Sequence, residues 1–446
     1  MKHRFEIKVK DEQGLIKLCD KLGVKFNPHI KTIYIPSLKI DTYPKKGKPV
    51  FTFITPKDPE LSIAEQRKPF WSNMPEHTYG EEPSFTTIYI DFDDTKYSLD
   101  DFSNLIEQNL TKNRNMYRYP YKDNMIRLNR IVGGPRQGEC PVYVISKGRS
   151  DCCGTSKHLS DMEVYHYVVV EPTEYQLYKE RVETEFATII QLDMTYKENY
   201  DACDELGNTI PKGSGGARNF CWDHSIALGA KWHWLFDDNT IRGFFWLKNN
   251  ARYKLKTGAF LRAIEDWVNR YENIGMAGLN YYFFRAPSSA NSPYIQNTRI
   301  YSYLLIRNDL PFRWRGRYNE DTILSLDVLK AGWCTTLINT FLADKACTQT
   351  VKGGNTDDLY KPNGTLPKSE MLERLHPDVS KVLWKYNRWH HHVDYTGFTQ
   401  ELKYKPEFEF MHGSESNDDY GMEMIEVPEE LEKDCRSYLE ENFLKK

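Results

Sequence analysis

Two adjacent carboxylates, Asp237 and Asp238, follow the apolar run WHWLF and precede Asn239. Hard cations such as Mg²⁺ and Mn²⁺ prefer carboxylate oxygens, and a strand that ends in two such groups presents them together. A cation held there can bind a diphosphate and take up charge as the diphosphate leaves. The chain contains five Asp-Asp pairs, at 93, 100, 237, 357 and 418, so the pair alone is not specific. Its position after a Gly-rich turn and a helix favours the pair at 237 as a metal site.

The Gly-rich turn over residues 212–217 leads into Arg218 and Asn219, in the opening turn of a predicted helix. Glycines let a backbone come close to a phosphate, a helix N-terminus favours an anion, and arginine adds a charge-assisted fork of donors. The turn therefore predicts a phosphate-binding site. A flexible surface turn is the alternative interpretation.

Polar side chains also mark the ends of two earlier predicted strands. Ser146 and Arg149 follow the first strand, and Glu171 follows the second. Groups at adjacent strand ends can hold a base and a ribose, with Glu171 accepting hydrogen bonds from ring N–H or hydroxyl groups. The alternative is a pair of ordinary solvated loops.

Glu320 and Asp321 open a predicted helix over residues 320–332. Carboxylates at a helix start are often only caps and partners of the helix dipole. In an enzyme that transfers a group to a hydroxyl, the same carboxylate can remove the proton of the attacking hydroxyl. The preceding run PFRWRGRY offers Arg315 and Arg317 to phosphates and Trp314 to a base, unless it is simply an aromatic hairpin with solvated arginines.

Two further motifs are weaker. His390 begins a run of three adjacent histidines, of which at most one or two could face a single metal ion or a diphosphate. The run TIYIDFDDT places Asp91 and Asp93 in the D-x-D-x-T spacing of haloacid-dehalogenase-type phosphatases, where the first is the nucleophile and the second the acid/base. The surrounding unit of about 45 residues is small for that fold.

The elements that would position these residues alternate between apolar strands and helices from residue 142 onward. Strands are expected at 142–146, 164–170, 187–192 and 233–238, with a helix between the last two, and further strands and helices to residue 332. This alternation is the signature of an open α/β sheet, whose ligands sit at the C-terminal ends of the strands.

The remaining chain is expected to form two further parts. Residues 1–135 read as a basic α+β accessory domain, because short strands and helices recur and residues 1–60 carry 13 Lys/Arg against 7 Asp/Glu. Residues 55–84 within it are rich in Pro, Glu and polar types and predict a loop. Residues 396–446 form an acidic C-terminal extension, with 14 Asp/Glu against 6 Lys/Arg over 401–446. The domain that carries the candidate site spans 140–395.

Bulk composition places the chain in a reducing, aqueous compartment. The 446 residues include nine scattered cysteines with no C-x-x-C pair, which disfavours a zinc ribbon or a redox motif. The N-terminus is charged where a secretory signal needs an apolar run, and no apolar stretch approaches about 18 residues. We expect a cytoplasmic protein that does not cross a membrane.

Four blocks in this order carry a family resemblance. VYVISKGRSDCCGTSKHL, YHYVVVEPTEYQLY, GGARNFCWDHSIALGAKWHWLFDDN and RYNEDTILSLDVLKAGWCTTLINTFLADK resemble the TET/JBP-associated glycosyltransferases, found in bacteriophages and beside base-oxidising dioxygenases. The resemblance covers about residues 140–395. It implies a GT-A-type, Rossmann-like core that moves a sugar, usually glucose from UDP-glucose, onto the hydroxyl of a hydroxymethylated pyrimidine in DNA.

The resemblance also implies roles for single residues. Ser146, Arg149 and Glu171 would bind the nucleotide, and Arg218 and Asn219 would face the donor. Asp237 and Asp238 would form the metal motif for Mn²⁺ or Mg²⁺, although D-D-N replaces D-x-D and leaves open which of the two binds metal and which meets the ribose. Asp321 would be the base of an inverting transfer, with Glu320 orienting the acceptor.

Three alternatives remain at this stage. The acceptor could be a protein or glycan hydroxyl in place of DNA. The chain could be a catalytically inactive nucleotide-sugar or DNA-binding module, although the intact acidic residues argue against that. The phosphatase that would use Asp91 and Asp93 is the most remote.

Overall fold

The computed structural model divides the chain into two compact units, each described by itself. The first comprises residues 1–53 and 80–125, and the second comprises residues 54–79 and 126–446. The structure describes residues 2–9, 12–23, 26, 32–35, 63–77, 86–93, 99–106, 116–119, 127–135, 137–207, 210–248, 251–284, 292–346, 366–385, 388–414 and 416–425.

The first unit holds a four-stranded sheet of order β2-β3-β1-β4 with two helices. Its elements are β1 (Lys2–Val9), α1 (Glu12–Lys21), β2 (Thr32–Ile35), β3 (Thr86–Asp93), α3 (Leu99–Leu105) and β4 (Met116–Tyr119). β3 pairs antiparallel with β1 and parallel with β2. Asp91 and Asp93, the candidate phosphatase residues, lie within β3.

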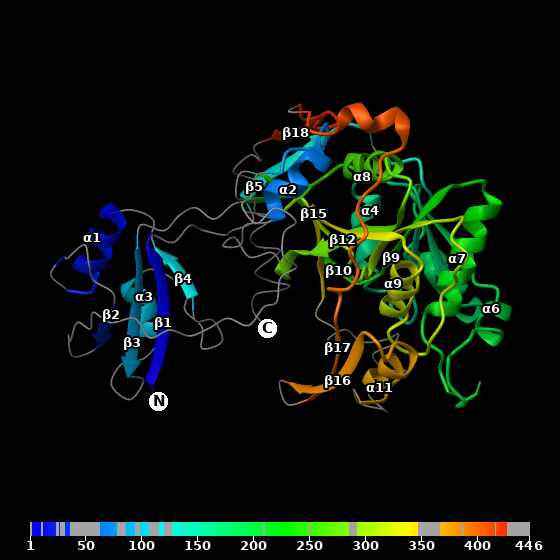
Figure 1. The fold of residues 1–446 in the computed structure, drawn as a ribbon, viewed down its shortest axis with the longest axis horizontal. Coiled ribbons are helices and arrows are strands. Elements are labelled where there is room, and N and C mark those ends of the chain that lie inside the picture. Colours follow the sequence, from blue (N-terminus) through cyan, green and yellow to red (C-terminus); the bar gives the residue numbers. More distant parts are fainter. Residues whose placement is uncertain are drawn as a thin grey trace. The chain divides into compact units, whose positions relative to one another are not determined.

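The second unit is built on one large mixed sheet of order β18-β5-β11-β10-β15-β12-β14-β9-β6-β7-β8, with β13 paired to β15 (Figure 1). The strands are β5 (Arg127–Gly133), β6 (Val142–Ile145), β7 (His166–Val170), β8 (Ala187–Gln191), β9 (Trp232–Asp237), β10 (Thr240–Lys248), β11 (Ala251–Leu255), β12 (Ile274–Tyr281), β13 (Tyr294–Gln296), β14 (Tyr303–Arg307), β15 (Cys334–Lys345) and β18 (Met422–Ile425). β16 (Ser380–Lys385) and β17 (Arg388–Val393) form a separate antiparallel hairpin.

The helices of this unit are α2 (Ile63–Arg67), α4 (Gly154–Ser160), α5 (Tyr175–Arg181), α6 (Thr195–Glu198), α7 (Gly215–Ala227), α8 (Ala259–Asn269), α9 (Glu320–Lys330) and α11 (Leu366–Leu375). Short 3₁₀ turns are η1 (Lys68–Trp71), η2 (Pro172–Glu174), η3 (Tyr282–Phe284) and η5 (Pro406–Met411). The α/β class expected from the alternation of strands and helices is confirmed. Among the described residues, no helix combines the length and the apolarity needed to cross a membrane.

Strand direction explains where ligands can bind. β6, β7, β8 and β9 are mutually parallel, β14 is antiparallel to both β9 and β12, and β15 is parallel to β12. β6, β9, β12 and β15 therefore all run in one direction, and their C-terminal ends meet at one edge of the sheet. Helical connections diverge on either side of β6 and β9, which is where open α/β sheets bind ligands.

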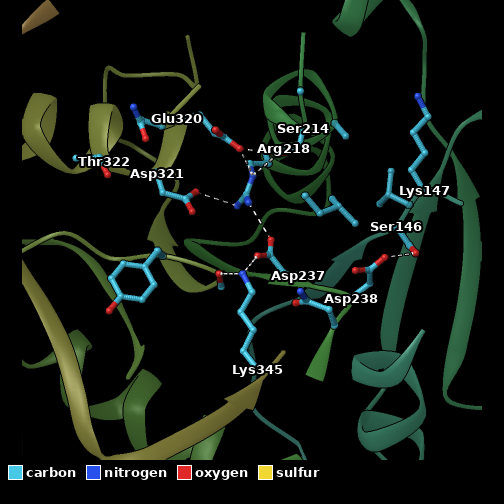
Figure 2. A pocket seen from close by; sticks show the side chains of 18 of the residues that line it. Ser146, Lys147, Ser214, Arg218, Asp237, Asp238, Glu320, Asp321, Thr322 and Lys345 are labelled. Carbon is cyan, nitrogen blue, oxygen red and sulfur yellow. Dashed lines mark hydrogen bonds and ion pairs between the residues drawn. The ribbon is translucent and has the colours of Figure 1, made fainter. Parts of the chain in front are cut away.

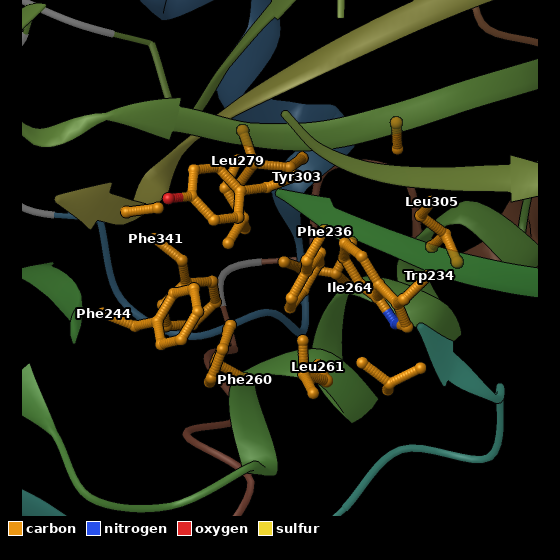
Figure 3. Packing of buried hydrophobic residues seen from close by; sticks show 14 of the residues in the cluster. Trp234, Phe236, Phe244, Phe260, Leu261, Ile264, Leu279, Tyr303, Leu305 and Phe341 are labelled. Carbon is orange, nitrogen blue, oxygen red and sulfur yellow. The ribbon is translucent and has the colours of Figure 1, made fainter. Parts of the chain in front are cut away.

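The central strands are apolar throughout because both of their faces are covered. Alternate residues of β9 belong to two different clusters: Trp234 and Phe236 face α8, and Leu235 faces α7. Figure 3 shows the first of these clusters, where the rings of Phe236, Phe244 and Phe260 pack together. α8 and α9 lie on opposite sides of the sheet (Figure 1). This rigid double-sided packing fixes the strand ends that carry the candidate site.

Segments outside residues 140–395 also belong to this core. Trp71 and Met74 are buried in the cluster under α8, and the Trp71 and Trp267 rings lie 5.1 Å apart. Trp267 Nε1 donates to the carbonyl of Phe70 at 2.8 Å. On the C-terminal side, β18 pairs with β5 and Met422 is buried. The stretch 55–84, expected as a loop, thus contains α2, η1 and core residues, because two large side chains suffice to anchor a short irregular segment.

Candidate active site

A pocket of about 460 Å³ lies at the carboxyl edge of the parallel strands. Ser146 follows β6, Asp237 ends β9 and is followed by Asp238, and Tyr281 and Lys345 end β12 and β15. Residues far apart in the chain thus converge because their strands share one direction. Figure 2 shows the acidic and basic side chains pointing toward one another in this space.

Both carboxylate oxygens of Asp237 are bonded to cations. Oδ1 accepts from Arg218 Nη2 at 2.9 Å, and Oδ2 accepts from Lys345 Nζ at 2.6 Å. Burial alone would raise the pKa of Asp237, but Lys345 and Arg218 hold it well below its usual value. Asp237 is therefore a fixed anion between two fixed cations.

Asp238 is buried and bonded on its other side. Its Oδ2 accepts from Ser146 Oγ at 2.5 Å, and its Oδ1 accepts from Arg149 Nη1. Burial raises the pKa of Asp238, and Arg149 offsets part of that rise. The Asp-Asp pair thus ties the end of β9 to the loop after β6.

Arg218 is the centre of the charge network. It lies in α7 with 2% of its surface exposed, and its guanidinium stacks over the buried Trp314 ring at 4.7 Å. Gly215 permits this placement of α7, because a Cβ there would lie 1.9 Å from the hydroxyl of Tyr200. The glycine is thus explained by helix packing, whereas the sequence suggested that it lets a phosphate approach.

Glu320 and Asp321 enter the pocket from the first turn of α9. Glu320 Oε1 accepts from Ser214 Oγ at 2.7 Å. Asp321 Oδ1 lies 3.3 Å from Arg218 Nη1, and within the described structure neither of these two buried atoms makes a hydrogen bond. Burial raises the pKa of Asp321 to about 7 despite the nearby Arg218. A carboxyl group that titrates near neutrality, with a pocket-lining oxygen that makes no hydrogen bond within the described structure, is suited to accept a proton.

A scan against protein-family models matches residues 140–354 to the TET-Associated Glycosyltransferase model. This part of the chain belongs to the TET-associated glycosyltransferase family. No curated protein matches the chain. The family resemblance noted in the sequence is therefore confirmed, and the domain is an enzyme that transfers a sugar. The phosphatase interpretation has no support from this match, which begins after Asp91 and Asp93.

Most of the expected site residues line the pocket of the TET-associated glycosyltransferase domain. They are Ser146, Arg149, Glu171, Arg218, Asp237, Asp238, Glu320, Asp321 and His390. Glu171 is bonded to Lys197 and lies 3.3 Å from Lys147 Nζ; burial would raise its pKa, but these two lysines lower it. Their roles in catalysis and binding stay predictions.

Four expected residues are not among those that line the pocket. Asn219 exchanges two hydrogen bonds with the backbone of Trp314, at 2.9 and 3.0 Å, and so holds the ring on which Arg218 stacks. Arg315 forms a two-pronged ion pair with Asp327, and Arg317 forms one with Asp204. Trp314 is 1% exposed. This arrangement gives no support to an acceptor role for Trp314, Arg315 or Arg317.

The sequence did not single out several cations of the pocket. Lys147, Lys197, Arg299, Lys345 and Lys368 line it, so seven Lys/Arg face five Asp/Glu there. Lys345 carried a detectable signal, because it ends the apolar run CTTLINTFLADK at the same edge of the sheet as Asp237. The excess of positive charge suits a negatively charged ligand.

The residues of the pocket do not fit the divalent cation that the family resemblance implies. All four oxygens of the Asp-Asp pair accept hydrogen bonds from Ser146, Arg149, Arg218 and Lys345. Within the described part of the chain, no group of three or more His, Cys, Asp or Glu side chains is placed to hold a metal ion.

Proposed function

We propose that the TET-associated glycosyltransferase domain moves a sugar from a UDP-sugar to the hydroxyl of a 5-hydroxymethylpyrimidine in DNA, with inversion at the anomeric carbon. One observation carries the proposal: Arg218 Nη1 and Asp321 Oδ1 form a buried ion pair at 3.3 Å in a cation-rich pocket, and neither atom makes a hydrogen bond within the described structure. The guanidinium can therefore still donate a hydrogen bond to a phosphate oxygen, and the carboxylate can still accept one from a hydroxyl.

The donor side of the pocket matches a nucleoside diphosphate. Arg218 and Lys345 provide positive charge for the diphosphate. Ser146 and Glu171 lie at the ends of β6 and β7, where polar groups can bind a base and a ribose. Separate groups are thus available for the diphosphate and for the nucleoside, which supports UDP as the part of the donor that the enzyme binds most tightly.

The reaction that fits these groups is a direct displacement. The acceptor oxygen forms a bond to the anomeric carbon while the bond between that carbon and the phosphate oxygen breaks, and the electron pair of that bond leaves with the diphosphate. Asp321 takes the proton of the acceptor hydroxyl. Glu320, held by Ser214, orients the acceptor. Attack opposite the leaving group inverts the anomeric carbon.

The β16–β17 hairpin supports DNA as the acceptor. Trp384 and Trp389 lie directly opposite each other, are 58% and 40% exposed, and have ring centroids 5.1 Å apart. Lys385 and Arg388, also exposed, are the next pair of the ladder. Like charges in opposite positions destabilise a hairpin, so their presence suggests a polyanionic partner. Exposed rings can stack on bases.

The same hairpin reaches the pocket, because His390 and His391 of β17 line it. A nucleic acid seated on the hairpin would therefore bring a nucleotide to the pocket. A base on which such an enzyme acts must flip out of the base stack, and exposed aromatic side chains can occupy the space that it leaves.

The decisive experiment is mass analysis of nucleosides from hydroxymethylated DNA incubated with the enzyme and a panel of nucleotide sugars. We expect a hexose added to 5-hydroxymethylcytosine or 5-hydroxymethyluracil, and no product from unmodified DNA. Release of UDP without any labelled nucleoside, together with labelling of a protein or glycan, would show that the acceptor is that protein or glycan and not DNA.

A further inference from the structure

Every carboxylate oxygen of the Asp237–Asp238 pair already accepts a hydrogen bond from a side chain. Asp237 is held by Arg218 and Lys345, and Asp238 by Arg149 and Ser146. A divalent cation at these oxygens would compete with four donors, three of which are positively charged and would repel it. The position that a metal ion takes in a D-x-D motif is thus occupied by side-chain cations.

The ammonium group of Lys345 is held in place by three neighbouring side chains. Its Nζ contacts Asp237 and Ser302 Oγ and lies 5.6 Å from the centre of the Tyr281 ring. Burial would lower the pKa of Lys345, but Asp237 raises it above its usual value, so the amine stays charged at neutral pH. An ammonium group has three donors, and the two bonds in the structure leave one for a ligand.

Arg218 offers a second donor to the same space. Nη2 binds Asp237 and Nε contacts Ser214, whereas Nη1 is buried, lies 3.3 Å from Asp321 Oδ1 as an ion pair, and makes no hydrogen bond within the described structure. A buried N–H group that makes no hydrogen bond is costly even beside an opposite charge. A phosphate oxygen would satisfy it, and a metal ion would not, because cations repel.

The charge of the whole pocket points the same way. Seven Lys/Arg against five Asp/Glu already give an excess of positive charge before any ligand binds. A diphosphate compensates this excess, whereas a divalent cation increases it.

We propose that Arg218 and Lys345 together replace the divalent cation, so that this glycosyltransferase binds its donor and stabilises the departing diphosphate without a metal. This inference rests on the proposed function. As the bond between the anomeric carbon and the phosphate oxygen breaks, the electron pair stays on the diphosphate. Arg218 and Lys345 stabilise the negative charge that develops there. The proton of the acceptor goes to Asp321, as before.

The test compares UDP binding and sugar transfer by the unaltered full-length enzyme in EDTA and in Mn²⁺ or Mg²⁺. We expect UDP to raise the melting temperature equally in EDTA and in Mn²⁺, and transfer to change less than about twofold. Loss of both the UDP-induced shift and the transfer in EDTA, with recovery on adding Mn²⁺, would overturn the proposal. This comparison needs no variant, so it does not depend on the folding of any mutant.

Variants then test whether Lys345 provides the positive charge that binds the diphosphate of UDP. Lys345→Ala should weaken UDP binding in EDTA by about 10- to 100-fold, the range of one charge-assisted contact, and Lys345→Arg should keep most of it. Lys330→Ala is the matched control, because Lys330 forms an ion pair with Asp378 at 2.7 Å outside the pocket. Unchanged UDP binding by a folded Lys345→Ala protein would contradict the assignment.

The two proposals fail in different ways. An enzyme that binds UDP and transfers sugar only with added metal refutes the metal-free site and leaves the proposed function intact. An enzyme that neither binds UDP nor transfers sugar under any metal condition refutes the proposed function, and the metal-free site with it.

Discussion

Asp321 is the residue on which the proposed chemistry depends most directly. Asp321→Asn keeps the shape of the side chain but removes its ability to take a proton. We expect sugar transfer to fall by about 10²- to 10⁴-fold, the usual contribution of a general base, with UDP binding nearly unchanged. Transfer is measured by labelled-sugar incorporation, and Asp309→Asn, an exposed aspartate paired with Arg307, is the control.

The same residue predicts a pH profile. Because burial raises the pKa of Asp321 to about 7, most of the base is protonated, and inactive, below that pH. The rate of transfer at saturating donor should therefore rise about tenfold per pH unit below 7 and level off above it. A rate that stays constant from pH 5 to pH 8 would remove Asp321 from the role of base.

At this scale the sequence predicted the acidic side of the site better than its basic side. Asp237, Asp238, Glu320 and Asp321 stood out because of their order along the chain, at the end of an apolar strand and at the start of a helix within one alternating α/β pattern. Lys345 did not, because its contact with Asp237 depends on β15 and β9 lying in one sheet, an arrangement that no local pattern encodes. The ion pairs of Arg315 with Asp327 and of Arg317 with Asp204 are likewise visible only in the fold.

The β16–β17 hairpin is the element that should recognise the acceptor. Trp384→Ala and Trp389→Ala should each weaken DNA binding by about 5- to 150-fold, which corresponds to about 1–3 kcal/mol per stacked base. UDP binding should not change, because neither ring lines the pocket. Phe410→Ala is the matched control, since Phe410 is 76% exposed on η5. Fluorescence anisotropy with a labelled hydroxymethylated duplex measures the effect.

Helix α8 contributes a second testable feature through Glu265. This buried carboxyl accepts from Trp234 Nε1 at 2.7 Å and from the backbone amides of Glu139 and Cys140, which precede β6. Burial raises its pKa to about 7, so the folded protein holds a proton that the unfolded chain releases above about pH 4.5. The free energy of unfolding should therefore fall by on the order of 3 kcal/mol from pH 4.5 to above 7.

Glu265→Gln should flatten that pH dependence, because an amide does not ionise. Chemical unfolding at several pH values measures the slope for both proteins. Asp321 contributes in the same direction, so the variant should keep part of the slope. An identical pH dependence in the two proteins would show that Glu265 does not titrate in this range.

The elements themselves were predicted more fully than their order. The strands β6 to β9 and the helix α9 match the expected segments to within two residues, and α7 lies between β8 and β9 as expected. The insertion of antiparallel β14 between β9 and β12 was not foreseen, since each strand is apolar throughout and its neighbours come from distant parts of the chain. Two-sided burial removes the alternation that would reveal direction or pairing.

At the scale of the whole molecule, the chain crosses between its two compact units three times, near residues 53, 79 and 125. A chain that begins at residue 140 would lack Trp71, Met74 and β5, all of which belong to the packing of the second unit. We expect such a fragment to be destabilised by on the order of 5 kcal/mol or more, because each large apolar side chain contributes about 1.5–3 kcal/mol when buried.

The control joins residues 54–79 to residues 126–446 through a flexible linker and so keeps the second unit whole. It should unfold cooperatively and bind UDP as the full chain does. Equal stability of the two shortened chains, measured by denaturant unfolding, would show that the segment 63–77 adds nothing to the core. The sequence could not place this boundary, since residues 63–77 have neither helical nor strand periodicity.

The packing of residues 63–77 under α8 has a consequence for synthesis. Phe70 and Trp267, which are joined by a hydrogen bond in the finished protein, lie 197 residues apart. A ribosome adding about 5–20 residues per second takes about 10–40 s to make that interval. Throughout this time Trp71 and Met74 are outside the ribosome without the helix that covers them. The nascent chain therefore exposes a short aromatic segment, and chaperones that bind exposed apolar residues can act on it before the core closes.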